Sequence, residues 1–137
     1  MKTVIIGDGK QRNFLQKKIE QENLTDHVQL VGSLSRNEVM EYMQQTKVFF
    51  HPSTYESFGF VFVEALANGT QIISRPVGIA EASERWQIGN TSDYFFEKIK
   101  NVLEKPNSDE ADYPYPISET LRKYLEIYHS SELKKIQ

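Results

Sequence analysis

The stretch STYESFGFVFVEALANGTQIISRPVG, residues 53–78, is the most informative part of this chain. It places two carboxylates, Glu56 and Glu64, eight positions apart around a turn that contains Gly59. Strong helix formers follow the turn, and an Asn-Gly pair then stops the helix before a short apolar run. This pattern predicts a loop that enters a helix whose first backbone amides face an anionic ligand.

Short apolar strands alternate with helical patterns on both sides of this stretch. Strands are predicted at Thr3–Ile6, Val28–Val31, Lys47–His51 and Gln71–Ser74. Helices are predicted after Gly9, after Ser35 (with Glu38 three residues later, as in a capping box) and over Gly59–Asn68. This order predicts an α/β fold, a Rossmann-like parallel sheet with helices on both faces.

The segment Phe58–Val63 alternates like a strand, but the helix formers that follow it favour a helix from about Gly59. After Gly78 the patterns are helical, and Asn90–Glu104 predicts an amphipathic helix capped near Thr91 or Ser92. We expect one domain over residues 1–104, a polar surface connection over 105–116, and a C-terminal helix over 117–137 that packs on the same domain.

The composition excludes several classes of function. The chain has no cysteine, and its three histidines are not at a metal-ligand spacing, so we expect no metal site. A net charge of −3 without a long basic block gives nucleic-acid binding little support. No apolar run approaches the roughly 20 residues of a membrane span.

Ligands of parallel α/β sheets bind beyond the carboxyl ends of the strands. Gly7-Asp8-Gly9 does not fit the dinucleotide fingerprint, because Arg12 stands at the third glycine position. The amides at Gly59 and the two residues after it suit phosphates, whereas the carboxylates suit hydroxyls, so a ligand with phosphates and sugar rings fits the whole segment. Alternatively, Glu56 is only a helix-entry carboxylate and Glu64 is solvated; the apolar neighbours of Glu64 argue against the second.

Four blocks, VIIGDG, VQLVGSLS, VFFHPSTYESFGFVFVEALANGTQIIS and PVGIAEA, occur in this order between about Val4 and Ser83. With them the chain resembles the nucleotide-sugar-binding domain of GT-B glycosyltransferases, in particular the retaining enzymes of glycosyltransferase family 4. The resemblance implies the C-terminal half of a GT-B fold and a UDP- or GDP-linked sugar as substrate, with no cofactor. It also implies that the donor phosphate helps to deprotonate the acceptor, so that no enzymic nucleophile is needed.

The resemblance assigns roles to individual residues. Glu56, the catalytic position, contacts hydroxyls of the transferred sugar, and Glu64 holds the ribose hydroxyls. The other expected donor-binding residues are Ser57, Gly59 and Phe60 near the sugar and diphosphate, and Ser33 and Leu34 beside the base. The roles of three further side chains are not assigned by the resemblance. For His51 we favour a structural role over that of a general base, and for Trp86 we favour packing. For Arg75 a phosphate contact and a surface role are equally expected.

The chain departs from the family pattern at its N-terminus. Family members have a strand and helix before the VIIGDG block, which carry an Arg and a Lys that neutralise the diphosphate. This first strand and helix are missing here, so we expect a truncated donor domain that binds weakly and transfers nothing by itself, each lost contact costing ~1.5–3 kcal/mol. Thr3–Ile6 is then expected to pair directly with Lys47–His51 or to find a substitute in another chain.

The expected function is that of a retaining donor domain, with a surface polysaccharide or glycolipid as acceptor. The expected partners are the nucleotide sugar and the missing acceptor domain or another chain, in the cytoplasm or, for the full-length protein, peripherally at the inner face of the membrane. An alternative is a non-catalytic binding or assembly module that has lost transferase activity. Another Rossmann-like domain, such as half of a sugar-nucleotide epimerase, fits the glutamate spacing less well.

Overall fold

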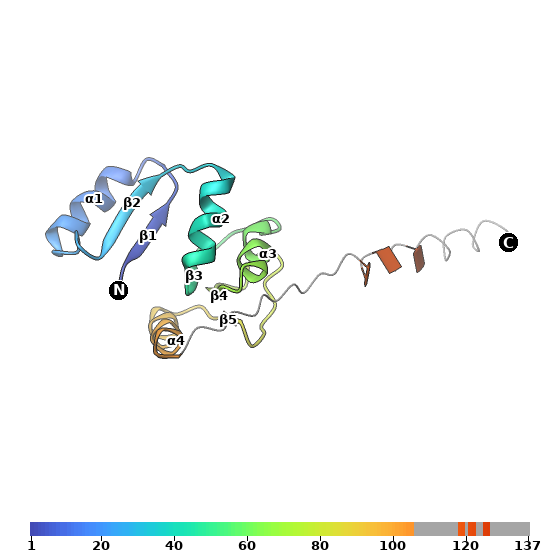
Figure 1. Ribbon diagram of the computed structural model, residues 1–137. Coiled ribbons are helices and arrows are strands. Elements are labelled where there is room, and N and C mark those ends of the chain that lie inside the picture. The colour runs from blue at the N-terminus through green and yellow to red at the C-terminus, as the bar shows by residue number, and fades with distance from the viewer. Residues whose placement is uncertain (106–117, 120, 123–124, 127–137) are drawn as a thin grey trace. The chain divides into compact units, whose positions relative to one another are not determined.

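The computed structural model describes residues 1–105, 118–119, 121–122 and 125–126 (Figure 1). It contains two compact units, Met1–Gln45 (unit 1) and Thr46–Gln137 (unit 2), each of which is described by itself. The elements follow the predicted alternation of strands and helices. Within the described residues, no helix is long and apolar enough to cross a membrane.

Unit 1 is a two-stranded parallel sheet with a helical connection. β1 (Thr3–Ile6) pairs with β2 (Val28–Gly32), with Thr3 opposite Val28. α1 (Arg12–Gln21) links the two strands, lies beside them in Figure 1, and buries Ile19. The parallel pairing explains the helix, because parallel neighbours need a crossover connection.

α2 (Arg36–Gln45) begins with the predicted capping box. The Ser35 amide donates to Glu38 Oε2 at 2.8 Å, and the Glu38 amide donates to Ser35 Oγ at 3.4 Å. The hydroxyl of Ser35, and secondly its backbone amide, lower the pKa of Glu38 below its ordinary value of 4.5. The box therefore contributes stability above that ordinary value, and this stability is lost as the pH falls through the lowered pKa.

Ser35→Ala is expected to raise the pKa of Glu38 part of the way back to 4.5, since the hydroxyl contact is lost while the backbone amide stays. A carboxyl-detected NMR titration of Glu38 measures the change directly. Ser35→Thr keeps a hydroxyl at the cap and is expected to leave the titration unchanged. An unchanged titration in the alanine variant would contradict the capping role of Ser35.

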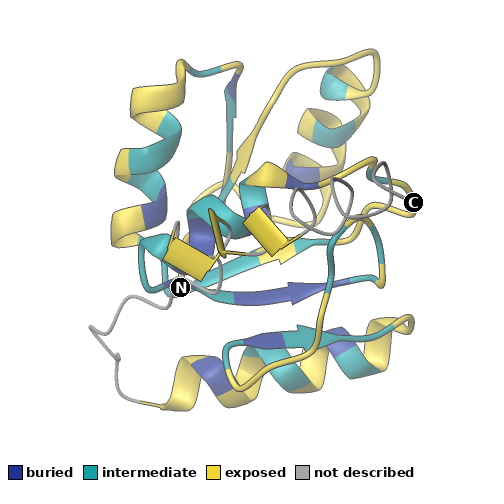
Figure 2. Cartoon of the chain, turned by 90° about the vertical axis from the view of Figure 1, so that its right-hand side faces the viewer, coloured by how far each residue is buried: buried dark blue, intermediate teal, exposed yellow. Residues whose placement is uncertain are grey.

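Unit 2 is built on a three-stranded parallel sheet in the order β3-β4-β5. β4 (Gln71–Ser74) lies between β3 (Val48–His51) and β5 (Trp86–Ile88). Ile72, Ile73 and Ser74 are completely buried, as expected of a central strand covered on both faces (Figure 2).

Helices cover both faces of this sheet. α3 (Phe60–Ala67) inserts Phe62 against Phe49 and Trp86, with ring centroids 6.3 and 4.7 Å apart. On the other face, α4 (Ser92–Glu104) packs Phe95 and Val102 against Ile73. Successive side chains of each strand point to opposite faces of the sheet, so the strands supply residues to both helix contacts. The predicted α/β architecture is confirmed.

Both ends of α4 are held by side chains. The Thr91 hydroxyl accepts the Tyr94 amide at 3.3 Å, which confirms one of the two predicted caps. At the other end, the Lys47 ammonium donates to the carbonyls of Leu103 and Lys105. This contact places a cation at a helix C-terminus, where the macrodipole favours it.

One expectation about the sheet is corrected. β5 was not predicted, because three residues are too short for a recognisable period and gain their conformation from pairing with β4. The predicted direct pairing of Thr3–Ile6 with Lys47–His51 would join the two units and stays a prediction; within the units, β1 pairs with β2 and β3 with β4 among the described residues. Pairing with another chain stays a prediction.

The predicted bounds of the domain, of the surface connection and of the C-terminal helix stay predictions. Residues 118–119, 121–122 and 125–126, inside the predicted last helix, are helical. The remainder of that helix and the surface connection after Lys105 lie outside the described residues.

Candidate functional site

The candidate site lies at the carboxyl end of β3, where a loop leads into α3. Gly59 ends this loop as the N-cap of α3, with φ 94° and ψ 50° in the left-handed region. A side chain there would also meet the Phe62 ring, since a Cβ atom would lie 2.5 Å from Cδ2. Glycine is therefore required, and the first amides of α3 are left without intrahelical acceptors.

Glu56 is fixed at the side of this helix entry. Its Oε1 atom accepts the backbone amide of Ser57 at 3.0 Å. Its Cγ atom lies in a narrow space between two glycines, 3.2 Å from the position of a Cβ atom on either Gly59 or Gly78. Glu56 is half-buried as a whole residue, and its side chain is held close to the N-terminus of α3.

A second loop, after β4, closes over the first. The Ile79 amide donates to the Phe58 carbonyl at 2.8 Å, and Gly78 adopts φ 58°. A Cβ atom on Gly78 would overlap the Phe58 carbonyl oxygen and lie 2.8 Å from its carbon. Sequence reasoning placed residues 74–78 at the carboxyl ends of the strands but gave Gly78 no role of its own, although its place in the Pro-Val-Gly turn was the available signal.

Exposed aromatic rings flank the glycine turn. The rings of Phe58 and Phe60 contact each other at a tilt of 41°, with centroids 4.5 Å apart, and the two residues are 45% and 70% exposed. Phe60 and Glu64 are four residues apart in α3, so they share one face of the helix. Glu64 is half-buried and lies about one turn inside the helix.

The floor of the site is apolar. Phe62 is completely buried and meets His51 edge-on at 4.9 Å and Trp86 at 4.7 Å. The Nδ1 atom of His51 is buried and has no hydrogen-bond partner in the described residues. His51 thus packs beneath the loop, and the predicted packing role of Trp86, which is 2% exposed, is confirmed.

Arg75 joins the loops that border the site. Its guanidinium donates to the carbonyls of Pro52 and Asn90, at 3.0 and 3.1 Å, and lies over the Phe95 ring. Sequence reasoning left a phosphate contact and a surface role open, and missed this link because it depends on three distant segments.

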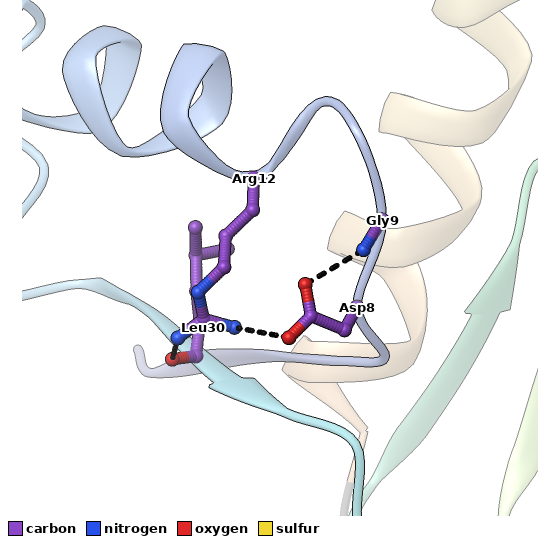
Figure 3. A network of polar contacts seen from close by, with 4 residues as sticks. All are labelled: Asp8, Gly9, Arg12 and Leu30. Atoms are coloured by element: carbon purple, nitrogen blue, oxygen red, sulfur yellow. Dashed lines mark hydrogen bonds and ion pairs between the residues drawn. The ribbon is translucent and has the colours of Figure 1, made fainter.

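The Gly7-Asp8-Gly9 turn belongs to unit 1 and is filled by its own side chains (Figure 3). Arg12 donates to the Leu30 carbonyl at 3.2 Å and lies 3.9 Å from Asp8, whose Oδ1 accepts the Gly9 amide. The cation that replaces the third glycine thus occupies the turn, as expected of an ordinary strand-to-helix connection. Ser33 and Leu34 follow β2 in the same unit, whose position relative to Glu56 is not determined.

The arrangement in unit 2 can bind two kinds of chemical group. The free amides at the start of α3 and the positive end of its dipole favour an anion such as a phosphate. The carboxylate of Glu56 beside them repels a phosphate but accepts hydrogen bonds from hydroxyls. A parallel α/β unit with these features at the carboxyl ends of its strands defines a ligand-binding domain of the Rossmann-like class.

The family follows from a direct match. Residues 1–113 match the family model described as glycosyl transferases group 1, so the chain belongs to this family. Its fold is that of the C-terminal domain of a GT-B glycosyltransferase. Sucrose-phosphate synthase from Thermosynechococcus elongatus has this fold as well: it is 20% identical, with a TM-score of 0.67 over 93% of this chain and 38% of the other.

Two curated relatives each align with about half of this chain. The phosphatidylinositol N-acetylglucosaminyltransferase gpi3 subunit of Schizosaccharomyces pombe is 39% identical over 75 residues, 55% of this chain and 16% of the relative. The 2-deoxystreptamine N-acetyl-D-glucosaminyltransferase of Niallia circulans is 34% identical over 71 residues, 52% of this chain and 18% of the relative. The matched segment thus makes up less than a fifth of the length of each relative.

Proposed function

We propose that this chain is the donor-binding domain of a retaining glycosyltransferase and that it binds a nucleotide-diphosphate sugar. The observation that carries the proposal is the position of Glu56, which lies beside the free amides of α3 in a narrow space between Gly59 and Gly78. A phosphate at the amides and a sugar hydroxyl at the carboxylate use both parts of this site.

Within this proposal, each residue serves one part of the donor. Glu56 accepts hydrogen bonds from the transferred sugar and is the catalytic residue, while the amides of Gly59 and Phe60 serve the diphosphate. Glu64, one turn further along α3, holds the ribose hydroxyls. The Ser57 amide already donates to Glu56, so Ser57 acts by orienting that carboxylate.

The proposal for Ser33 and Leu34 concerns the nucleoside base. Both residues follow β2, a strand whose carboxyl end is a usual place for ligand contacts. Ser33 is exposed and Leu34 half-buried, which suits a polar and an apolar contact with the same ring.

The relatives suggest which donor to test first. Both are named as N-acetylglucosaminyltransferases but differ in the acceptor that they name, so the proposal is confined to the donor. UDP-N-acetylglucosamine is the first probe, followed by other UDP- and GDP-sugars. Because the matched segment makes up less than a fifth of each relative, we propose that these 137 residues bind weakly, near the millimolar range, and do not transfer the sugar alone.

Truncated ligands test the two carboxylates separately. Glu64→Ala is expected to weaken UDP binding about 10-fold but to leave the binding of a 2′,3′-dideoxy analogue unchanged, because only ribose hydroxyls reach Glu64. Glu56→Gln is expected to weaken UDP-N-acetylglucosamine and not UDP. Chemical-shift titrations measure all of these affinities on the 137-residue chain.

Glu104→Gln is the matched control for these variants. Glu104 lies on α4 with 64% of its side chain exposed, and its substitution removes the same charge from unit 2. Undiminished UDP binding by Glu64→Ala would contradict the ribose assignment. If the unaltered chain binds none of the nucleotide sugars, the proposed function itself is wrong.

A further inference from the structure

We propose that Arg75 is a positioning residue for the donor site, an inference that rests on the proposed function. Arg75 is the first residue after β4, the central strand of unit 2. It is the point at which the loops after β3, β4 and β5 are joined. Through these contacts it sets the position of the loop that carries Glu56.

The backbone at this point is fixed by a buried network. Ser74 is completely buried, and its hydroxyl accepts the Trp86 indole N–H at 2.8 Å and donates to the Arg75 carbonyl at 2.9 Å. The Ser74 carbonyl accepts the amide of Gly89 at 3.0 Å. Arg75 therefore leaves β4 from a rigid base, because a satisfied buried polar network allows little movement.

The Arg75 side chain extends this rigidity to the neighbouring loops. Nε donates to the Pro52 carbonyl at 3.0 Å and Nη1 to the Asn90 carbonyl at 3.1 Å. Both carbonyls lie just beyond strand ends, where the sheet no longer supplies donors. The guanidinium lies 5.6 Å from the centroid of Phe95, a buried residue of α4, which adds a cation–π attraction to the two hydrogen bonds.

This geometry needs arginine rather than any cation. Two carbonyls on different loops are reached by two donors of one planar group, whereas a lysine ammonium is a point charge on a flexible stem. Pro52 opens the loop that leads to Glu56 four residues later, and the Glu56 carboxylate in turn accepts the Ser57 amide. Arg75 thus acts on the donor through the position of this loop.

The test measures loop order and donor affinity together on the 137-residue chain. Arg75→Met is expected to increase amide exchange at Ser57 about tenfold and to weaken UDP-N-acetylglucosamine binding by a similar factor. Arg75→Lys is expected to recover part of both, with changes near threefold. Lys100→Met, which removes a charge from an exposed position on α4, is expected to change neither.

Each outcome separates the possible roles of Arg75. Weaker binding with unchanged Ser57 exchange would indicate a direct contact with the donor and would overturn the positioning role, as would unchanged binding in both Arg75 variants. Faster exchange in a chain that binds no nucleotide sugar would support the loop contact and refute the proposed function instead. If Arg75→Met does not fold, Arg75→Lys decides the question by the same two measurements.

Discussion

Phe62→Ala is expected to destabilise unit 2 by about 3–5 kcal/mol, the usual cost of removing a buried phenylalanine. Phe62 is completely buried, and its ring contacts three neighbours that come from two strands. Phe49 and His51 lie on β3 and Trp86 on β5, at centroid distances of 6.3, 4.9 and 4.7 Å. Removal of the ring leaves a cavity between α3 and one face of the sheet, and the three neighbouring rings cannot all move to fill it.

Urea denaturation followed by tryptophan fluorescence measures this loss. Trp86 is the single tryptophan of the chain and contacts Phe62 directly, so its signal reports unit 2. Phe96→Ala makes the same truncation at a residue of α4 that is 73% exposed and is expected to change the free energy of unfolding by less than about 0.5 kcal/mol. A loss below about 1.5 kcal/mol for Phe62→Ala would show that the ring is not central to the core.

Most of the fold was predictable from the sequence, because its strands and helices have local signals. The four predicted strands end within one residue of the observed ones, because each is a short apolar run stopped by glycine, proline or a polar turn. The ambiguous segment after Phe58 forms a helix, as the run Glu64-Ala65-Leu66-Ala67 indicated. β5 was not predicted, because the three residues Trp-Gln-Ile are too few to show a hydrophobic period and form a strand through pairing with Ile72 and Ile73.

The candidate site was predictable only where it is local in sequence. Glu56, Gly59 and Phe60 lie within five residues, and the structure places them together at the start of α3. The contacts that hold them come from elsewhere in the chain. The Ile79 amide, which follows Gly78, and the Arg75 guanidinium close the site by donating to carbonyl groups of distant loops, and such pairings leave no periodic signal in a single sequence.

Gly78→Ala is expected to weaken nucleotide-sugar binding at least tenfold and to cost about 2–4 kcal/mol of stability. Gly78 has φ 58°, which disfavours a residue with a side chain. The added methyl group would overlap the Phe58 carbonyl oxygen, so the hydrogen bond from the Ile79 amide to that oxygen must lengthen or break. The methyl group also meets Glu56 Cγ, which moves the carboxylate away from the entry of α3.

Gly32→Ala is the matched control for the backbone effect. Gly32 also has a positive φ, 78°, but a Cβ atom there meets only the flexible end of Arg12, at 3.2 Å. Its cost is expected to stay near the 1–2 kcal/mol of a left-handed residue. Amide spectra of Glu56, Ser57 and Gly59 report the loop in the Gly78 variant, and UDP-N-acetylglucosamine titrations report the affinity. Unshifted amides together with unchanged affinity would show that the loop after β4 does not hold Glu56 in place.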